Sequence, residues 1–261
     1  MSLTKKFVLI LGSISLATLL GTFLYNKNHS GDWVKIKESK ITEAIYGLAT
    51  LESDDIFRYR VGITSQIKKL NVKEGANVKK GDLLMQLSEG AIVRTPIDGV
   101  VTQLDIKENE TAFPNANLIT VMNLNKVALT ITLEQASAIR VRPTLPVKIQ
   151  FESIKGIPID GIVRSVYPKD GQFVIKVDLK EIPPSTLPGM TADTAIIVGE
   201  KEKAMVVPLR SIQRDILTIR ENGSTKKVQV KTGFQDSENI EILSSAELTI
   251  KPGMEVWVSR E

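Results

Sequence analysis

A repeat at an offset of 34 residues is the feature that most limits how this 261-residue chain can fold. Gly75 and Gly81 are matched by Asn109 and Asn115, and glycine and asparagine tolerate positive φ best. Apolar and charged positions recur with these turns, in the pairs Ile67/Val101, Leu70/Leu104, Val72/Ile106, Lys73/Lys107, Glu74/Glu108, Leu84/Leu118 and Leu87/Val121. We therefore predict two similar four-stranded halves that form one small β-sandwich about a pseudo-two-fold axis. The alternative is chance similarity between β-rich segments.

Strand patterns also dominate the rest of the chain after the first 26 residues. Glu221-Asn222-Gly223-Ser224 is typical of a β-hairpin turn, and it lies between the strand-like runs 217–220 and 227–230. Short runs rich in valine, isoleucine and threonine, bounded by turn residues, occur at 127–133, 147–151, 173–179, 194–198 and 228–230. Residues 134–140 could form one or two helical turns. We expect a mainly β protein.

The amino-terminal segment predicts a membrane anchor. Phe7 to Tyr25 are 19 residues without a charge, and a helix of this length spans roughly 28 Å, close to the thickness of a bilayer core. Lys5 and Lys6 precede it, so the amino terminus should lie in the cytoplasm and the bulk of the chain outside it. The alternative is a cleaved signal peptide, but the segment is long and ends in bulky residues. We expect an uncleaved transmembrane helix.

The residue types argue against an active site. There is no cysteine and a single histidine, His29, directly after the apolar segment. This excludes disulfides, thiolate chemistry and the usual zinc and triad arrangements. No phosphate-binding glycine loop is present. We therefore expect no enzyme activity, no catalytic, cofactor-binding or metal-binding residues and no cofactor.

Charge and aromatic residues suggest solvated surface and core rather than a nucleic-acid site. The net charge is +4, and lysine alternates with glutamate, as in 201–203, without the basic stripe of a nucleic-acid-binding protein. Asp54 and Asp55 should face opposite ways on a strand, as solvated surface. We expect Trp33 and Trp257 to pack in a core; contact with a membrane is the alternative.

Two stretches carry a resemblance to a known family. Residues 67–87 resemble the first half of a biotinyl/lipoyl-type domain, and Thr95-Pro96-Ile97-Asp98-Gly99-Val100-Val101 resembles the opening of its second half. Both halves, behind an amino-terminal anchor, resemble the HlyD-type membrane-fusion or periplasmic adaptor family. More loosely, 187–192 resembles a stretch that closes the family's β-barrel domain, and 206–212 resembles the entry strand of its membrane-proximal domain.

The resemblance implies a fold and domain boundaries. These are a cytoplasmic tip and transmembrane anchor (1–25), the first part of a membrane-proximal β-domain (26–55), a lipoyl-like β-sandwich (56–124), a β-barrel (125–198) and the second part of the membrane-proximal domain (199–261). The chain thus runs out from the membrane and back.

The sequence departs from the family between the two lipoyl halves. Members that work in tripartite pumps carry a long α-helical hairpin there, but seven residues are too few for two antiparallel helices. These residues are Ser88, Glu89, Gly90, Ala91, Ile92, Val93 and Arg94. They include no lysine for a prosthetic group. We predict that they form a partner-contact loop with an apolar centre at 91–93; the plainer interpretation is that 91–93 continue a strand into the core.

The resemblance implies a non-catalytic adaptor subunit of an inner-membrane efflux or ABC-type export complex. Such a subunit would be a single-pass inner-membrane protein with its bulk in the periplasm, and it would form a homo-oligomeric ring around its transporter without binding nucleic acid. The alternative is a membrane-anchored cell-envelope scaffold, or a regulatory subunit of a transporter that builds no conduit.

Overall fold

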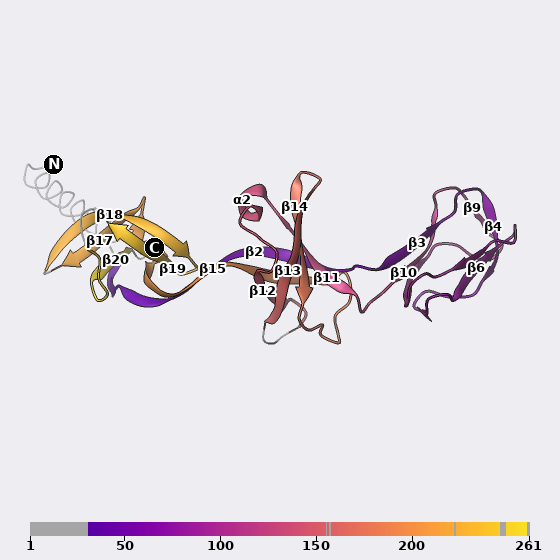
Figure 1. The fold of residues 1–261 in the computed structure, drawn as a ribbon, viewed down its shortest axis with the longest axis horizontal. Helices are drawn as coiled ribbons and strands as arrows, with labels where there is room; N and C mark the ends of the chain where they lie inside the picture. Colours follow the sequence, from indigo (N-terminus) through magenta and orange to yellow (C-terminus); the bar gives the residue numbers. More distant parts are fainter. Residues whose placement is uncertain (1–30, 155, 157, 222, 246–248, 260–261) are drawn as a thin grey trace, which may run out of the picture. The chain divides into compact units, whose positions relative to one another are not determined.

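The structure is a computed structural model that describes residues 31–154, 156, 158–221, 223–245 and 249–259 (Figure 1). The predicted anchor 7–25 and His29 lie outside the described residues. Within the described ranges, no helix has the length and apolar character needed to cross a membrane. These ranges are mainly β, as predicted, with one four-residue helix, α2 (Gln135–Ala138), and one 3-10 helix, η1 (Leu209–Ser211).

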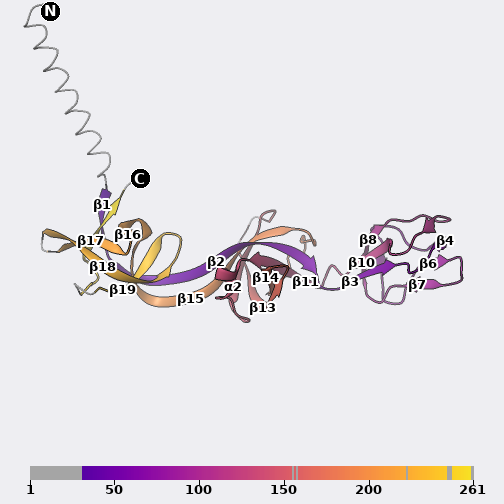
Figure 2. The same ribbon diagram turned by 90° about the horizontal axis from the view of Figure 1, so that it is seen from above.

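The chain divides into two compact units. Of the described residues, unit 1 combines those up to Glu43 with those from Gly199 onward, and unit 2 is Ala44–Val198. Two long strands, β2 (Lys37–Ser53) and β15 (Thr191–Pro208), contribute to both units and pair with each other (Figure 2). The segment 26–55, which we expected to serve one domain, is therefore shared, because β2 continues past Glu43 into the second unit.

Unit 1 is a curved antiparallel sheet. Its strand order is β1-β20-β17-β18-β19-β15, with β16 paired to β17. Residues of alternate positions, among them Leu217, Ile219, Val228 and Val256, are buried on its inner face. The predicted hairpin is present, since Glu221 pairs with Ser224 and Gly223 has a φ of 81°. The strands are β1 (Gly31–Lys35), β16 (Ile212–Gln213), β17 (Ile216–Glu221), β18 (Ser224–Gln235), β19 (Asn239–Ser245) and β20 (Glu255–Ser259).

One part of unit 2 is a six-stranded barrel. Its strand order is β15-β12-β13-β14-β11-β2, and the pairing of β2 with β15 closes it. Leu129, Ile131, Ile149 and Phe151 fill its core together with Leu51 of β2. The sequence placed the barrel within 125–198 and missed this sixth strand. The remaining strands are β11 (Val127–Leu133), β12 (Pro146–Phe151), β13 (Ile159–Lys169) and β14 (Gln172–Leu179).

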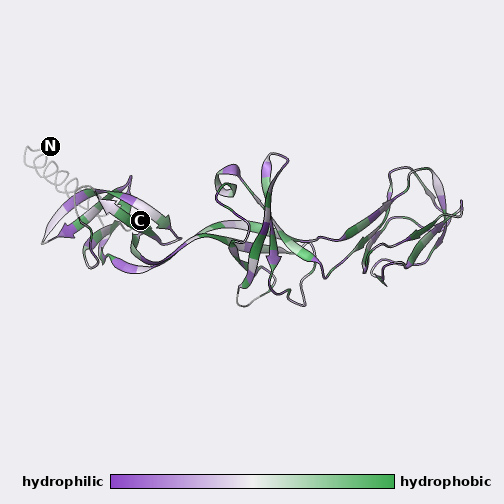
Figure 3. Cartoon of the chain, in the orientation of Figure 1, coloured by the Kyte–Doolittle hydropathy of each residue, from purple (hydrophilic) through white to green (hydrophobic). Residues whose placement is uncertain are grey.

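The other part of unit 2 is a sandwich of two four-stranded sheets, ordered β3-β10-β8-β5 and β7-β6-β4-β9. An offset of 34 residues carries β3 to β7, β4 to β8, β5 to β9 and β6 to β10, so it also carries one sheet onto the other. The strands are β3 (Ile56–Arg60), β4 (Ser65–Leu70), β5 (Asn77–Val78), β6 (Leu83–Leu87), β7 (Ile92–Arg94), β8 (Gly99–Leu104), β9 (Thr111–Ala112) and β10 (Asn117–Met122). Figure 3 shows hydrophobic residues along the strands of this sandwich and of the barrel.

Candidate functional site

The turns of the repeat adopt matching conformations in the two halves. Gly75 and Gly81 have φ values of 79° and 94°, and Asn109 and Asn115 both have 66°. The Gly75 amide donates to the Val101 carbonyl at 2.8 Å, and the Asn109 amide donates to the Ile67 carbonyl at 2.7 Å. The left-handed backbone thus lets each half bind an edge of the other half, which is why these positions carry glycine or asparagine.

Two glutamates join the halves reciprocally. Glu74 accepts the amide hydrogen of Leu104 at 2.9 Å, and its repeat partner Glu108 accepts that of Leu70 at 2.9 Å. A carboxylate that accepts a backbone N–H makes a charge-assisted hydrogen bond, which is stronger than a neutral one. The repeat of glutamate at 74 and 108 therefore reflects an interaction that holds the sandwich together.

Valine at Gly75 or Gly81 should destabilise the sandwich by about 1–2 kcal/mol, because a β-branched residue fits positive φ poorly. No atom lies within 4 Å of a Cβ built at either glycine, so the cost is one of backbone conformation alone. Asparagine should cost less, as it already occupies the equivalent positions. Thermal melts of Gly75→Val and Gly75→Asn, with the same pair at Gly81, test this. Equal stability of the valine and asparagine variants would contradict the matching of the turns.

The segment between the two halves is a tight β-hairpin rather than a long loop. Strands β6 and β7 pair directly, with Met85 opposite Val93. The Leu87 amide donates to the Ala91 carbonyl at 2.8 Å, and the Gly90 amide donates to the Leu87 carbonyl at 3.0 Å. With Gly90 at a φ of 85°, this is a three-residue hairpin loop of residues 88–90. The glycine is the sequence signal that could have located this turn.

The hairpin modifies the predicted contact loop. Val93 is 5% exposed and packs in the sandwich core, because side chains alternate along β7. Ala91 and Ile92 remain exposed, Ile92 at 55%. Arg94 donates to the Gly81 carbonyl at 2.7 Å, which ties the hairpin to a turn of the first half. The candidate contact surface is therefore the turn 88–90 with Ala91 and Ile92, and its role as a contact stays a prediction.

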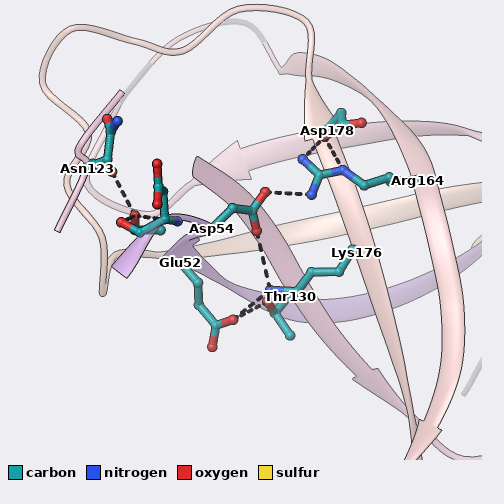
Figure 4. Close-up of polar contacts among 9 residues, drawn as sticks. Glu52, Asp54, Asn123, Thr130, Arg164, Lys176 and Asp178 are labelled. Carbon is teal, nitrogen blue, oxygen red and sulfur yellow. Dashed lines mark hydrogen bonds and ion pairs between the residues drawn. The ribbon is translucent and has the colours of Figure 1, made fainter. Parts of the chain in front are cut away.

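A cluster of ionised side chains lies on the barrel where the chain passes between barrel and sandwich (Figure 4). Arg164 on β13 binds Asp178 on β14 and also Asp54, at 2.5 Å from Nη1 to Oδ2. Lys176 on β14 binds Glu52 on β2 at 2.8 Å and the Thr130 hydroxyl at 2.7 Å. The cluster thus ties the end of β2, and Asp54 directly after it, to β13 and β14.

The two segments that connect barrel and sandwich are hydrogen-bonded to each other. The Ser53 hydroxyl donates to the Asn123 carbonyl at 2.7 Å, and the Asn123 amide donates to the Asp55 carbonyl at 3.0 Å. Asp55 also pairs with Lys126 at 3.2 Å. Asp54 and Asp55 pair with different cations of the protein, Arg164 and Lys126, instead of forming unpaired solvated surface. The sequence prediction missed this because both partners are far away along the chain.

The cluster shifts the pKa values of its members. Burial alone would raise the pKa of Glu52, but hydrogen bonds from Lys176 and Thr130 outweigh it and hold the pKa below its ordinary value of 4.5. The pKa of Arg164 lies above its ordinary value, chiefly through the hydrogen bond to Asp178 and then the one to Asp54. Arg164 therefore stays charged at any working pH.

Replacing Glu52 with glutamine should lower the melting temperature of unit 2 most at neutral pH. A carboxylate with a lowered folded-state pKa stabilises the fold above its unfolded pKa, and this contribution is lost as the pH falls through the folded value. The difference between wild type and Glu52→Gln should therefore shrink below pH 4.5. Glu181→Gln, at an exposed position of unit 2, is the control. A difference that does not change with pH would contradict the role of Glu52.

The described residues offer no metal centre, since no group of three or more histidine, cysteine, aspartate or glutamate side chains lies close enough together among them. The ionised side chains of Figure 4 are satisfied by one another. Glu52, Thr130 and Lys176 line a pocket of about 350 Å³, and there they are hydrogen-bonded to one another.

Neither a family model nor a curated protein matches the sequence. Solved structures do match the fold. MacA from Actinobacillus actinomycetemcomitans has a TM-score of 0.74 at 16% identity, over 87% of this chain and 99% of that one. A MacA-MexA chimera containing the Pseudomonas aeruginosa MexA α-hairpin domain has a TM-score of 0.73 at 17% identity, over 87% and 100%. ZneB from Cupriavidus metallidurans has a TM-score of 0.55 at 16% identity, over 88% and 92%.

These structural neighbours are membrane fusion, or periplasmic adaptor, proteins. The agreement extends over nearly the whole of each matched chain, so it covers both units and not one common β-module. The chain therefore has the fold of the membrane fusion proteins, with a three-residue turn between the two halves of its sandwich.

Proposed function

We propose that this chain is a non-catalytic adaptor subunit of an inner-membrane efflux or ABC-type export complex. The observation that carries the proposal is the pairing of a duplicated sandwich with a six-stranded barrel and a unit built from both chain ends, in a fold that MacA shares at a TM-score of 0.74. Within the described residues, the side chains of each polar cluster bind one another and stabilise the fold. This accords with a role in binding rather than catalysis.

The proposal includes a place in the cell and an assembly. Residues 7–25 anchor the chain in the inner membrane, unit 1 is the membrane-proximal domain, and several copies form a ring around the extracytoplasmic face of the transporter. Ring closure would suit a chain with open sheet edges, because a closed ring leaves no free edge to aggregate.

Purification of the tagged full chain from native membranes tests this. We expect a multimeric complex that contains an integral membrane transporter, identified by its own permease or ATPase sequence. A chain that purifies as a monomer, without any transporter even after crosslinking in intact cells, would contradict the adaptor role.

The exposed turn of the β6–β7 hairpin is the proposed partner contact. Residues 56–124 lie between the two segments of the chain that form unit 1, so in sequence this turn is distant from both segments. A photoreactive residue at Glu89 should capture a partner protein or a second ring. The same residue at Glu181, also exposed in unit 2, is the control. Capture of the transporter alone, from Glu89, would contradict the proposal that this turn contacts a separate partner protein or a second ring.

The three-residue turn favours one further candidate, a scaffold or regulatory subunit that binds a transporter without building a conduit. A hairpin of this size offers no helices that could extend toward an outer-membrane duct. Export assays separate the two functions: deletion of a conduit adaptor abolishes transport, whereas deletion of a regulatory subunit changes its rate and leaves transport present.

A further inference from the structure

The outer face of unit 1 carries a groove of about 780 Å³ that the proposed adaptor function does not use. It is lined by side chains from five strands and from η1, among them Trp33, Trp257, Arg210, Arg214, Lys227 and Ile216. Along β17 and β18 the lining residues alternate with the buried residues of the inner face, because Thr218 pairs with Lys227 while Leu217 pairs with Val228. The groove therefore belongs to the solvent face of the sheet.

Two tryptophans form one wall of the groove. Trp33 on β1 pairs directly with Trp257 on β20, and their rings pack edge to face with centroids 5.3 Å apart. Both are only partly buried and lie in the groove rather than in the core of unit 1, which differs from the expectation of core packing. Arg220 lies 3.9 Å from the centre of the Trp33 ring and pairs with Glu255 at 3.3 Å. Its charge is thus balanced, and it positions Trp33 by a cation–π contact.

The remaining cations of the groove are not balanced. Arg210, Arg214 and Lys227 are exposed, and no carboxylate is among the described residues that line the groove. Among the described residues, none of the three forms an ion pair, in contrast to the paired cations Lys40, Arg164 and Lys176 elsewhere in the chain. Arginine and lysine that converge on a groove without acids are suited to bind a phosphate, and guanidinium groups can do so with two parallel hydrogen bonds.

The position of the groove in the chain indicates the source of that phosphate. Gly31, at the start of β1, follows the predicted anchor after only five residues, 26–30. At about 3.5 Å per extended residue, that segment reaches roughly 20 Å at most. Trp33 is two residues further on. Tryptophan favours the membrane interface, where its ring meets apolar chains and its N–H meets polar headgroups.

We propose that this groove binds the headgroups of anionic phospholipids in the membrane that holds the anchor. Arg210, Arg214 and Lys227 bind the lipid phosphates, and the edge of the Trp33–Trp257 pair contacts the interface. The two tryptophans then set the depth at which unit 1 lies on the bilayer. This binding needs no transporter, so it is separate from the adaptor function and can succeed or fail independently of it.

The chain contains only two tryptophans, both in this groove, so the intrinsic fluorescence of the full chain reports on this site. The full chain is reconstituted in vesicles of phosphatidylcholine with a minority of phosphatidylglycerol. Two preparations are compared, in which an equal number of brominated acyl chains is carried either by phosphatidylcholine or by phosphatidylglycerol. Only the lipid that carries the quencher then differs. We expect stronger quenching when phosphatidylglycerol carries the bromine.

The variant Arg210→Gln/Arg214→Gln/Lys227→Gln should lose this preference. Each cation near an anionic surface accounts for roughly a five-fold gain in affinity, so removing three should weaken it by about 100-fold. The matched control Lys37→Gln/Lys203→Gln/Lys251→Gln removes the same charge from exposed positions of unit 1 that do not line the groove. It should keep the preference.

Equal quenching by the two brominated lipids in the wild type would overturn the proposal, as would a preference that survives in the groove variant or is lost in the control. A last experiment adds inorganic phosphate to the full chain in vesicles of phosphatidylcholine alone. If it changes the tryptophan emission as much as phosphatidylglycerol does, the groove is a site for free anions, and the membrane-surface assignment is wrong.

Discussion

Replacing Lys201 with methionine is expected to destabilise unit 1 by about 3 kcal/mol, because it leaves a buried carboxylate without its cation. Glu241 on β19 is 3% exposed, and Lys201 on β15 is its ion-pair partner. The only other hydrogen bond to this carboxylate among the described residues is from the Phe234 amide, at 3.2 Å. We place the effect at the lower end of the range for buried pairs, since the side chain of Lys201 is 47% exposed and water can replace part of it.

A second substitution separates the ion pair from simple packing. The double variant Lys201→Met/Glu241→Gln should recover most of the lost stability, because a neutral amide is far less costly to bury than a carboxylate and its oxygen can still accept the Phe234 hydrogen bond. Lys203→Met, at an exposed position of the same strand, should change stability by less than about 0.5 kcal/mol. Denaturant titrations followed by tryptophan fluorescence measure unit 1, which holds both tryptophans. A double variant no more stable than Lys201→Met would refute the role of the pair.

The sandwich could be predicted from the sequence because its determinants are local and occur twice. Gly75, Gly81, Asn109 and Asn115 mark turns that demand positive φ, and the apolar residues between them keep a fixed spacing. The hairpin between the halves was predicted less well. The short distance from Leu87 to Thr95 excluded helices, but the strand β7 could be assigned only from its pairing with β6.

The sixth strand of the barrel could not be predicted from the sequence. Its strands β11, β12 and β14 have clear patterns, but β2 joins β11 through pairs such as Ala49 with Ile131, which lie more than 80 positions apart. A strand's own residues do not specify such a distant neighbour. Asp54, directly after β2, was predicted to be solvated surface for the same reason, although the fold brings Arg164 of β13 and Lys176 of β14 to it.

The groove of unit 1 is likewise built from residues that lie far apart in the sequence. Trp33 and Trp257 come from opposite ends of the chain. Arg210 lies on η1, Arg214 in the turn between β16 and β17, and Lys227 on β18. The sequence offered membrane contact as an alternative for the tryptophans, but the convergence of the cations on them depends on the order β1-β20-β17-β18.

Replacing Leu16 with arginine should release the chain from the membrane. On insertion scales, a charged residue at the centre of a spanning helix costs about 2.5–3.5 kcal/mol, and Leu16 is the middle residue of the uncharged segment 7–25. Membrane fractionation and the intact mass of the mature protein are the measurements. We expect wild type and Leu16→Phe in the membrane fraction with an intact amino terminus, and Leu16→Arg largely outside it. A mature wild-type chain that begins near Asn26 would show that the segment is a cleaved signal.

The arginine variant also separates the anchor from the groove of unit 1. An apolar span holds a protein in the bilayer at any salt concentration, whereas headgroup binding by Arg210, Arg214 and Lys227 is electrostatic and is screened as ionic strength rises. Purified Leu16→Arg protein should therefore bind vesicles that contain phosphatidylglycerol at low salt and leave them at high salt, while wild type remains bound in both. Adding the three groove substitutions to Leu16→Arg should abolish the low-salt binding. If the combined variant still binds at low salt, the contact with anionic lipid lies elsewhere on the chain, even where the anchor prediction holds.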